Sequence, residues 1–199
     1  MKDELVSLNT PEASCRLILL HGWGADAQDL IPLGEIIQRD FGEKIEIIAF
    51  RAPFLHPQGI GRQWYALFPP DWEEAYSSVE NLKVRLKAIA TKKLPLTKTF
   101  VLGFSQGGAM ALASCFDLPL AGLIGCSAYP HPNLEFTKES PPIFLTHGDN
   151  DDVVPIVAME KIISLSKINQ IEHQIFTGGH EIPLTLLPRI VSVMKNWLK

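Results

Sequence analysis

The chain has 199 residues, of which 46% are hydrophobic and 20% are charged, and its formal net charge is −4. This length and composition are typical of an ordinary globular protein, so we expect residues 1–199 to form a single domain that needs neither disulfides nor a structural metal. The negative charge and the scattered Lys and Arg residues exclude nucleic-acid binding from the functions considered.

Short apolar runs alternate with segments of helical periodicity along the chain. In chain order the sequence predicts a strand at 16–20, a helix at 26–40, a strand at 45–50, a helix at 75–93, a strand at 99–103, a helix at 105–116, strands at 120–128 and 142–147, a helix at 155–168, a strand at 171–176 and a helix at 184–198. Most of these strands are continuously apolar, which is typical of strands that helices cover on both faces. The sequence therefore predicts an α/β fold with a mostly parallel central sheet flanked by helices on both faces.

Residues 51–72, RAPFLHPQGIGRQWYALFPPDW, interrupt this alternation with Pro, Gly and several aromatic residues and show no clean period. Loops of this length are uncommon inside a compact domain and often form lids or binding walls. We therefore expect a long loop that contacts the substrate. Within it we assign Trp64 and Phe68 to an apolar substrate pocket, with packing in the core as the alternative for both.

The segment 101–113, VLGFSQGGAMALA, carries a serine between glycines where a predicted strand meets a predicted helix. A serine hydroxyl needs a neighbouring base and a fixed, exposed position to act as a nucleophile. The sharp turn of a G-x-S-x-G elbow supplies that position, and its crowded backbone tolerates only very small residues two places before and after the serine. Gly103 and Gly107 occupy those places, so we predict that Ser105 is a nucleophile. The alternative is a glycine-rich turn with a surface serine, which the flanking strand and Ala-rich helix disfavour.

Acid and histidine candidates follow Ser105 in the order Ser, Asp, His that α/β-hydrolases use. The segment GDNDDVVP follows the strand at 142–147, and TGGHEIP follows the strand at 171–176. Both lie at the C-terminal ends of predicted parallel strands, where ligands bind in open α/β sheets. His180 fits as the base, because the two glycines before it let its loop reach over the sheet. Spacing alone does not choose among the three acids, which are Asp149, Asp151 and Asp152.

A tetrahedral oxyanion needs two hydrogen-bond donors, which in this fold are the amide after the nucleophile and an amide from an earlier loop. The first donor is the backbone amide of Gln106. The earlier loop lies within residues 19–30, LLHGWGADAQDL, where glycines flank Trp23 directly after the first apolar strand. We assign the second donor to the backbone amide of Trp23.

The other histidines have no partners at the spacing of metal ligands. We interpret His56, His131 and His173 as structural or solvated, and His21 and His147 as residues that brace turns at strand ends. We therefore expect no metal and no cofactor.

The cysteines and the N-terminal sequence indicate the cellular compartment in which the protein is expected. Cys15, Cys115 and Cys126 are odd in number and lie in or beside apolar runs, which predicts buried free thiols in a reducing compartment and hence a cytoplasmic protein. The N-terminus lacks the apolar core of a signal peptide, and no stretch approaches about 18 consecutive apolar residues. We expect no stable membrane insertion, and the sequence leaves a homodimer open.

Four segments of the chain resemble one protein family, and they are LLHGWGADAQDL, LGFSQGGAMAL, THGDNDDVVP and GGHEIP. The family they resemble is the phospholipase/carboxylesterase family of α/β-hydrolases, in which acyl-protein thioesterases are the best-known members. The resemblance spans roughly residues 16–198 and implies a minimal α/β-hydrolase without a separate cap domain. HGDNDDVVP is similar to the H-G-x-x-D-x-x-V-P segment of the family, whose catalytic aspartate aligns with Asp151. The resemblance thus implies a triad of Ser105, Asp151 and His180 that acts without a cofactor through an acyl-enzyme.

The resemblance also implies the substrate class, which is carboxylic esters or thioesters of small molecules. HPQGIGRQWYAL is similar to bacterial carboxylesterases of the family, and the segment between Trp64 and Ser105 is shorter than in the thioesterase members. Both features favour short or medium acyl groups. One alternative is a lysophospholipase or acyl-protein thioesterase that acts on long acyl chains. Another is a non-catalytic hydrolase-fold protein that binds a ligand, which the presence of Ser, Asp and His together disfavours.

Overall fold

A central sheet organises the computed structural model, which describes residues 5–8, 10–42, 44–165 and 171–199. Among these residues, seven strands lie side by side in the order β1 (Leu5–Leu8), β3 (Ile45–Phe50), β2 (Cys15–Leu20), β6 (Thr99–Phe104), β7 (Gly122–Cys126), β8 (Ile143–Gly148) and β9 (Ile171–Phe176). β1 pairs antiparallel with β3, and every other neighbouring pair is parallel. The six predicted strands all form, and β1 is an additional edge strand that the sequence analysis missed.

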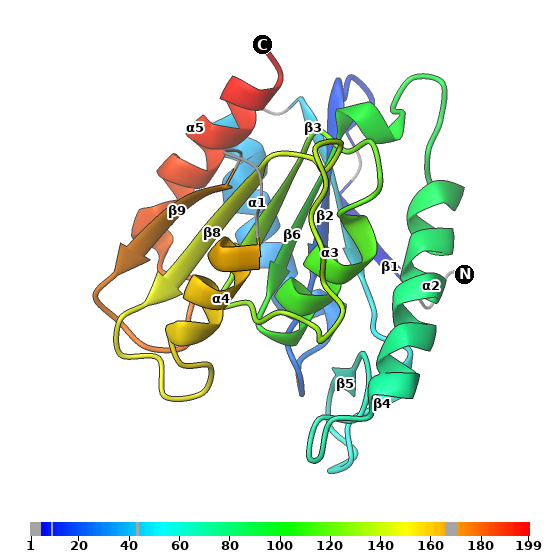
Figure 1. The fold of residues 1–199 in the computed structure, drawn as a ribbon. Coiled ribbons are helices and arrows are strands. Elements are labelled where there is room, and N and C mark those ends of the chain that lie inside the picture. The colour runs from blue at the N-terminus through cyan, green and yellow to red at the C-terminus, as the bar shows by residue number, and fades with distance from the viewer. Residues whose placement is uncertain (1–4, 9, 43, 166–170) are drawn as a thin grey trace.

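Helices cover both faces of this sheet (Figure 1). They are α1 (Ile31–Phe41), α2 (Trp72–Ala88), α3 (Gln106–Cys115), α4 (Val157–Leu165) and α5 (Leu187–Trp197), with short 3₁₀ turns η1 (Ala27–Leu30), η2 (Leu96–Lys98) and η3 (Leu184–Leu186). α1 and α5 lie on one face, whereas α2, α3 and α4 lie on the other. All five predicted helices form, although positions 166–168 of the predicted helix at 155–168 lie outside the described residues. No helix of the described chain combines the length and apolarity that crossing a bilayer requires.

The strands are continuously apolar because alternate side chains enter two separate cores. Along β2, Ile18 and Leu20 pack with α2 and α3, whereas Leu17 and Leu19 pack with α1 and α5. All four side chains are fully buried. The sequence pattern therefore predicted burial on both faces correctly.

The segment 51–72 is more ordered than the expected long loop. It contains a hairpin of two very short strands, β4 (Phe54–Leu55) and β5 (Arg62–Gln63). The Arg62 amide donates to the Ala25 carbonyl, and the Arg62 carbonyl accepts from Gly24, both at 2.8 Å. These bonds tie the hairpin to the loop that follows β2, at the end of the sheet toward which the parallel strands point (Figure 1).

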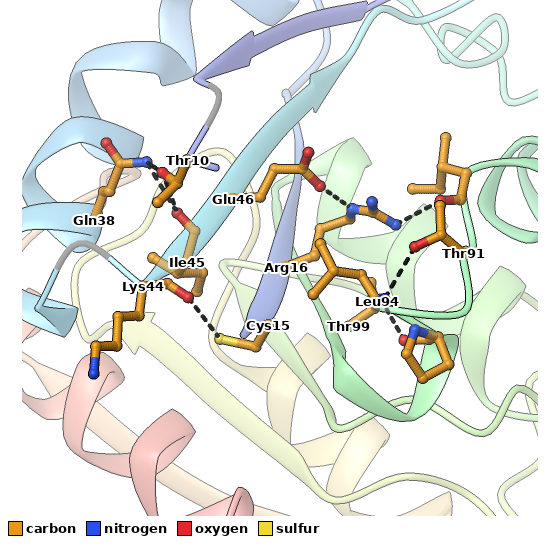
Figure 2. Close-up of polar contacts among 12 residues, drawn as sticks. Thr10, Cys15, Arg16, Gln38, Lys44, Ile45, Glu46, Thr91, Leu94 and Thr99 are labelled. Atoms are coloured by element: carbon orange, nitrogen blue, oxygen red, sulfur yellow. Dashed lines mark hydrogen bonds and ion pairs between the residues drawn. The ribbon is translucent and has the colours of Figure 1, made fainter. Parts of the chain in front are cut away.

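The opposite end of the sheet is held by polar contacts around Arg16 (Figure 2). This side chain is almost fully buried, forms an ion pair with Glu46 on β3 and donates through Nη1 to the Ile89 carbonyl at 2.7 Å. Ile89 follows the last residue of α2. Arg16 thereby joins two strands of the sheet to the end of a helix that covers it.

Candidate active site

Ser105 occupies a strained turn between β6 and α3. Its backbone has φ of 54° and ψ of −119°, a conformation that side-chain-bearing residues rarely adopt. A Cβ atom on Gly103 would lie 2.2 Å from the Gly107 carbonyl oxygen, and one on Gly107 would lie 2.2 Å from the Leu20 carbonyl oxygen. Both glycines are therefore needed for the close approach of α3 to the ends of β6 and β2, as the sequence predicted.

The Ser105 hydroxyl does not cap α3. The Ser105 backbone is instead fixed by its amide, which donates to the Cys126 carbonyl at 2.9 Å. The turn thus holds the serine firmly and leaves its oxygen available to react.

Asp151 and His180 are brought together by the loops after β8 and β9. His180 Nδ1 lies 2.8 Å from Asp151 Oδ2, and Asp151 Oδ1 accepts from the amides of Val153 at 3.0 Å and Val154 at 2.8 Å. Burial alone would raise the pKa of Asp151, but the hydrogen bonds from His180 and Val154 outweigh burial and hold the pKa below its ordinary value. The carboxylate is therefore ionised at neutral pH and fixes the orientation of the imidazole.

The other two aspartates of this loop do not contact His180. Asp149 braces the two loops, because its carboxylate accepts from the Gly178 amide at 3.2 Å and its own amide donates to the Phe176 carbonyl at 2.9 Å. Asp152 is exposed. Among the three acids that spacing left open, only Asp151 is placed to orient His180.

Gln106 directly follows Ser105, and the loop that carries Trp23 passes close to Ser105, because a Cβ on Gly22 would lie 3.4 Å from the Ser105 Cβ and Trp23 lines the same cavity. Gln106 is the first residue of α3, so its N–H has no acceptor within the helix. No backbone carbonyl of the described residues accepts the Trp23 N–H. The Trp23 ring is fixed by a bond from Nε1 to Gln63 Oε1 at 2.8 Å. The Gln106 side chain is fully buried, where Oε1 accepts from the Trp64 amide and Nε2 donates to the Tyr65 carbonyl.

Two other histidines, His21 and His147, hold turns near the candidate triad. His21 Nδ1 donates to the Gly22 carbonyl at 2.8 Å, and His21 Nε2 accepts from the Ala52 amide at 3.1 Å. Burial lowers the pKa of His21. His147 Nε2 donates to the Val154 carbonyl at 2.7 Å, which steadies the turn that carries Asp151. Over the described residues, no cluster of three His, Cys, Asp or Glu side chains is arranged to hold a metal ion.

A cavity of about 610 Å³ opens over Ser105 and His180. Phe68 lines it and is 78% exposed. The assignment of Trp64 requires correction, because Trp64 does not line the cavity. Its ring is 1% exposed in the core, and Nε1 donates to the His21 carbonyl at 2.9 Å.

The sequence analysis missed part of the cavity wall. Tyr129 lines it from the segment after β7, Val154 lines it from the segment after β8, and Ala158 lines it from α4. The signal for Tyr129 was present, since this residue directly follows a predicted parallel strand at its C-terminal end.

Known proteins resemble this chain over most of its length. The family model described as Phospholipase/Carboxylesterase matches residues 2–198. Acyl-protein thioesterase 1 of Saccharomyces cerevisiae is 28% identical over 166 residues, which are 70% of this chain and 71% of the relative. Among solved structures, esterase PE8 gives a TM-score of 0.84 at 29% identity, covering 96% of both chains. A Bacillus cereus carboxylesterase gives a TM-score of 0.82 at 18% identity, covering 97% of this chain and 93% of its own, and shows the same fold. The predicted α/β-hydrolase fold is thereby confirmed.

Proposed function

We propose that this chain, which belongs to the phospholipase/carboxylesterase family, is a carboxylic ester hydrolase that cleaves short- to medium-chain esters or thioesters through an acyl-enzyme on Ser105. One constellation carries the proposal. Ser105 and His180 line the same cavity, while His180 Nδ1 lies 2.8 Å from Asp151 Oδ2. A nucleophile, a base and a group that orients the base are the parts that acyl transfer by a serine hydrolase requires.

In the first half of the proposed reaction, His180 Nε2 takes the proton from Ser105 Oγ as that oxygen attacks the carbonyl carbon. Asp151 stabilises the imidazolium that forms. The carbonyl oxygen becomes an oxyanion and accepts hydrogen bonds from the amides of Trp23 and Gln106. When the intermediate collapses, the bond to the leaving alcohol or thiol breaks, and that group takes the proton from His180.

In the second half, water replaces the leaving group. His180 removes a proton from the water as its oxygen attacks the acyl carbon, and the same two amides hold the second oxyanion. Collapse then releases the carboxylic acid and returns the proton to Ser105 Oγ. Every proton transfer uses a group already in the cavity, so the proposed reaction needs no cofactor.

An aromatic pair supports the preference for short and medium acyl groups. The rings of Trp23 and Phe68 meet edge to face with centroids 5.3 Å apart, and both line the cavity beside Ser105. Two packed rings at this position limit the room for an extended acyl chain. The short segment between Trp64 and Ser105 supports the same preference.

A long-chain activity, as a lysophospholipase or acyl-protein thioesterase, is the second candidate. It is favoured by the named yeast relative and by apolar side chains at the cavity that face solvent, since Phe68 is 78% and Val153 is 66% exposed. Exposed apolar groups at a cavity mouth could hold the outer part of a long chain.

We further propose that the protein works in a reducing compartment such as the cytoplasm. Cys15, Cys115 and Cys126 are free and buried. Burial raises the pKa of Cys15 and Cys126 to about 11 and that of Cys115 to about 12, so these thiols stay protonated and unreactive.

The decisive experiment is the hydrolysis of p-nitrophenyl esters with acyl chains from two to sixteen carbons by the wild type and Ser105→Ala. We expect activity that is highest at short or medium chains, and a fall in kcat of about 10⁴- to 10⁶-fold in Ser105→Ala, because the acyl-enzyme can no longer form. An exposed serine on α2 supplies the control, Ser77→Ala, which should retain wild-type kinetics.

The outcomes separate the candidates. A maximum at long chains would support the second candidate in place of the first. A loss below tenfold in Ser105→Ala would contradict both, and would leave a hydrolase-fold protein that binds a ligand without catalysis.

A further inference from the structure

A chain of hydroxyl and imidazole groups runs from the cavity wall into the core. The Tyr129 hydroxyl oxygen lies 2.7 Å from that of Tyr65, which in turn lies 3.0 Å from His131 Nε2. Tyr65 and His131 are buried, at 0% and 3% exposure, whereas Tyr129 is partly exposed and lines the cavity that holds Ser105. The proposed hydrolysis uses none of these three groups.

The direction of the hydrogen bonds follows from the buried end of this chain. Burial lowers the pKa of His131 to about 4, so the imidazole is neutral at neutral pH and carries one N–H. His131 Nδ1 is buried and has no partner among the described residues. Because a buried N–H without an acceptor is rarer and costlier than an unused lone pair, we assign the proton to Nε2.

With the proton on Nε2, His131 donates to the Tyr65 oxygen. The Tyr65 hydroxyl then donates to the Tyr129 oxygen, because among the described residues its buried hydrogen has no other acceptor once His131 Nε2 carries a proton. The hydroxyl hydrogen of Tyr129 is left unused by the chain. Hydrogen bonds in such a series polarise one another, which makes the terminal hydroxyl a stronger donor.

We propose that the Tyr129 hydroxyl donates a hydrogen bond to an oxygen of the substrate other than the reacting ester group, so that the enzyme prefers esters with an ether, hydroxyl or keto oxygen near the scissile bond. This inference rests on the proposed function. Most of the surrounding wall is apolar, including Trp23, Phe68 and Phe104. In such a pocket a single well-placed polar group fixes orientation and specificity, and Ser105 and His180 are already committed to the reaction.

The test uses two pairs of esters that match in length and differ by one oxygen. In the first pair, p-nitrophenyl methoxyacetate is compared with p-nitrophenyl butyrate, which places the oxygen in the acyl group. In the second, 2-methoxyethyl butyrate is compared with butyl butyrate, which places it in the alcohol. The quantity measured is the ratio of kcat/KM for the ether ester to that for the alkyl ester. The two esters of a pair also differ in intrinsic chemical reactivity, but this difference cancels when the ratio of the wild type is compared with that of a variant.

Tyr129→Phe keeps the ring and removes the donor, so the ratio should fall about 3- to 10-fold in at least one pair, as the loss of one neutral hydrogen bond predicts. Tyr76→Phe is the matched control, because Tyr76 is an exposed tyrosine that does not line this cavity, and its ratios should equal those of the wild type. Unchanged ratios in both pairs for Tyr129→Phe would overturn the proposal. Thermal unfolding of each variant checks that it is folded.

Tyr65→Phe tests the direction of the chain. In the assigned direction it removes the donor to Tyr129, so the ratio should fall or stay constant. In the reverse direction it would release the Tyr129 hydrogen from Tyr65, and a rise in the ratio would therefore contradict the proposal. The proposed function is judged separately, by whether hydrolysis of p-nitrophenyl butyrate depends on Ser105.

Discussion

His131 is the buried histidine with the clearest consequence for stability. Its pKa is lowered by burial to about 4 in the folded chain, whereas an unfolded chain gives histidine a value of about 6.5. At pH values between these two pKa values, the unfolded state binds a proton that the folded state does not. Stability is therefore lost as the pH falls through this window.

We expect the His131 contribution to lower the free energy of unfolding by about 2 kcal/mol between pH 7 and pH 5. Urea unfolding at both pH values measures it, and His131→Gln should show a change smaller by that amount. His173→Gln, at an exposed histidine, should keep the wild-type change. Burial also lowers the pKa of His21, which makes stability fall with falling pH in the same way. His21 remains in every variant, so some pH dependence of the free energy of unfolding persists. An equal change in wild type and His131→Gln would contradict the prediction.

At the scale of residues, the sequence predicted positions at strand ends better than it predicted which side chains face the cavity. Ser105 and His180 could be placed because each follows an apolar strand at its C-terminal end. Asp151 needed the family resemblance, because three acids share its loop. Trp64 could not be placed, because its ring packs in the core with residues distant in the chain, and its Nε1 donates to the carbonyl of His21, 43 positions away. Nothing in the local pattern around Trp64 signals that contact.

At the scale of elements, the contact between α3 and β2 joins Ser105, the proposed nucleophile, to the loop that carries Trp23, a proposed oxyanion donor. A Cβ on Gly107 would lie 2.2 Å from the Leu20 carbonyl oxygen and 2.5 Å from that of His21. Neither atom is the flexible end of a side chain, so the helix and the strand must separate. Such a shift would also move the Gln106 amide relative to the Trp23 amide.

We therefore expect Gly107→Ala to lower the free energy of unfolding by about 3 kcal/mol, as overpacking does, and to lower kcat by about 100-fold, as the loss of one oxyanion donor does. Chemical unfolding and ester hydrolysis measure the two effects. Gly59→Ala is the control, because Gly59 has a φ of 75° with nothing within 4 Å of the added Cβ, and it should cost only about 1–2 kcal/mol of backbone strain. Wild-type kcat in Gly107→Ala would show that the two amides do not depend on this contact.

The elements that the sequence missed are those with little periodicity to detect. β4 and β5 have two residues each, and they are defined by pairing with each other and with the loop after β2. β1 has four residues at the sheet edge. α2 was predicted three residues late, because Asp71 caps it before the apolar repeat begins, with its carboxylate accepting from the Glu74 amide at 2.9 Å.

At the scale of the whole molecule, one end of the sheet holds the candidate catalytic groups and the other end holds contacts that stabilise the fold. The loops after β2, β6, β8 and β9 bring the candidate catalytic groups to one end, and the ion pair of Arg16 and Glu46 lies at the other (Figure 2). Arg16 and Leu20 are separated by about 13 Å along β2. Because the strands are packed on both faces, the far end can support the fold without contacting the substrate.

This division can be tested by removing one charge from the buried pair. In Glu46→Gln the Arg16 side chain, 5% exposed, keeps its charge and loses its ionic partner, so the free energy of unfolding should fall by about 2–3 kcal/mol. Its kcat/KM for a preferred ester should stay within about twofold of the wild type, since a side chain at the far end of β2 touches none of the reacting groups. The exposed pair of Arg189 and Glu172, at 46% and 54% exposure, provides the matched control, and Glu172→Gln should cost less than about 1 kcal/mol. A large loss of activity in a folded Glu46→Gln protein would mean that the two ends of the sheet are coupled. In that case the strands would transmit strain to the loop that carries Trp23 instead of isolating it.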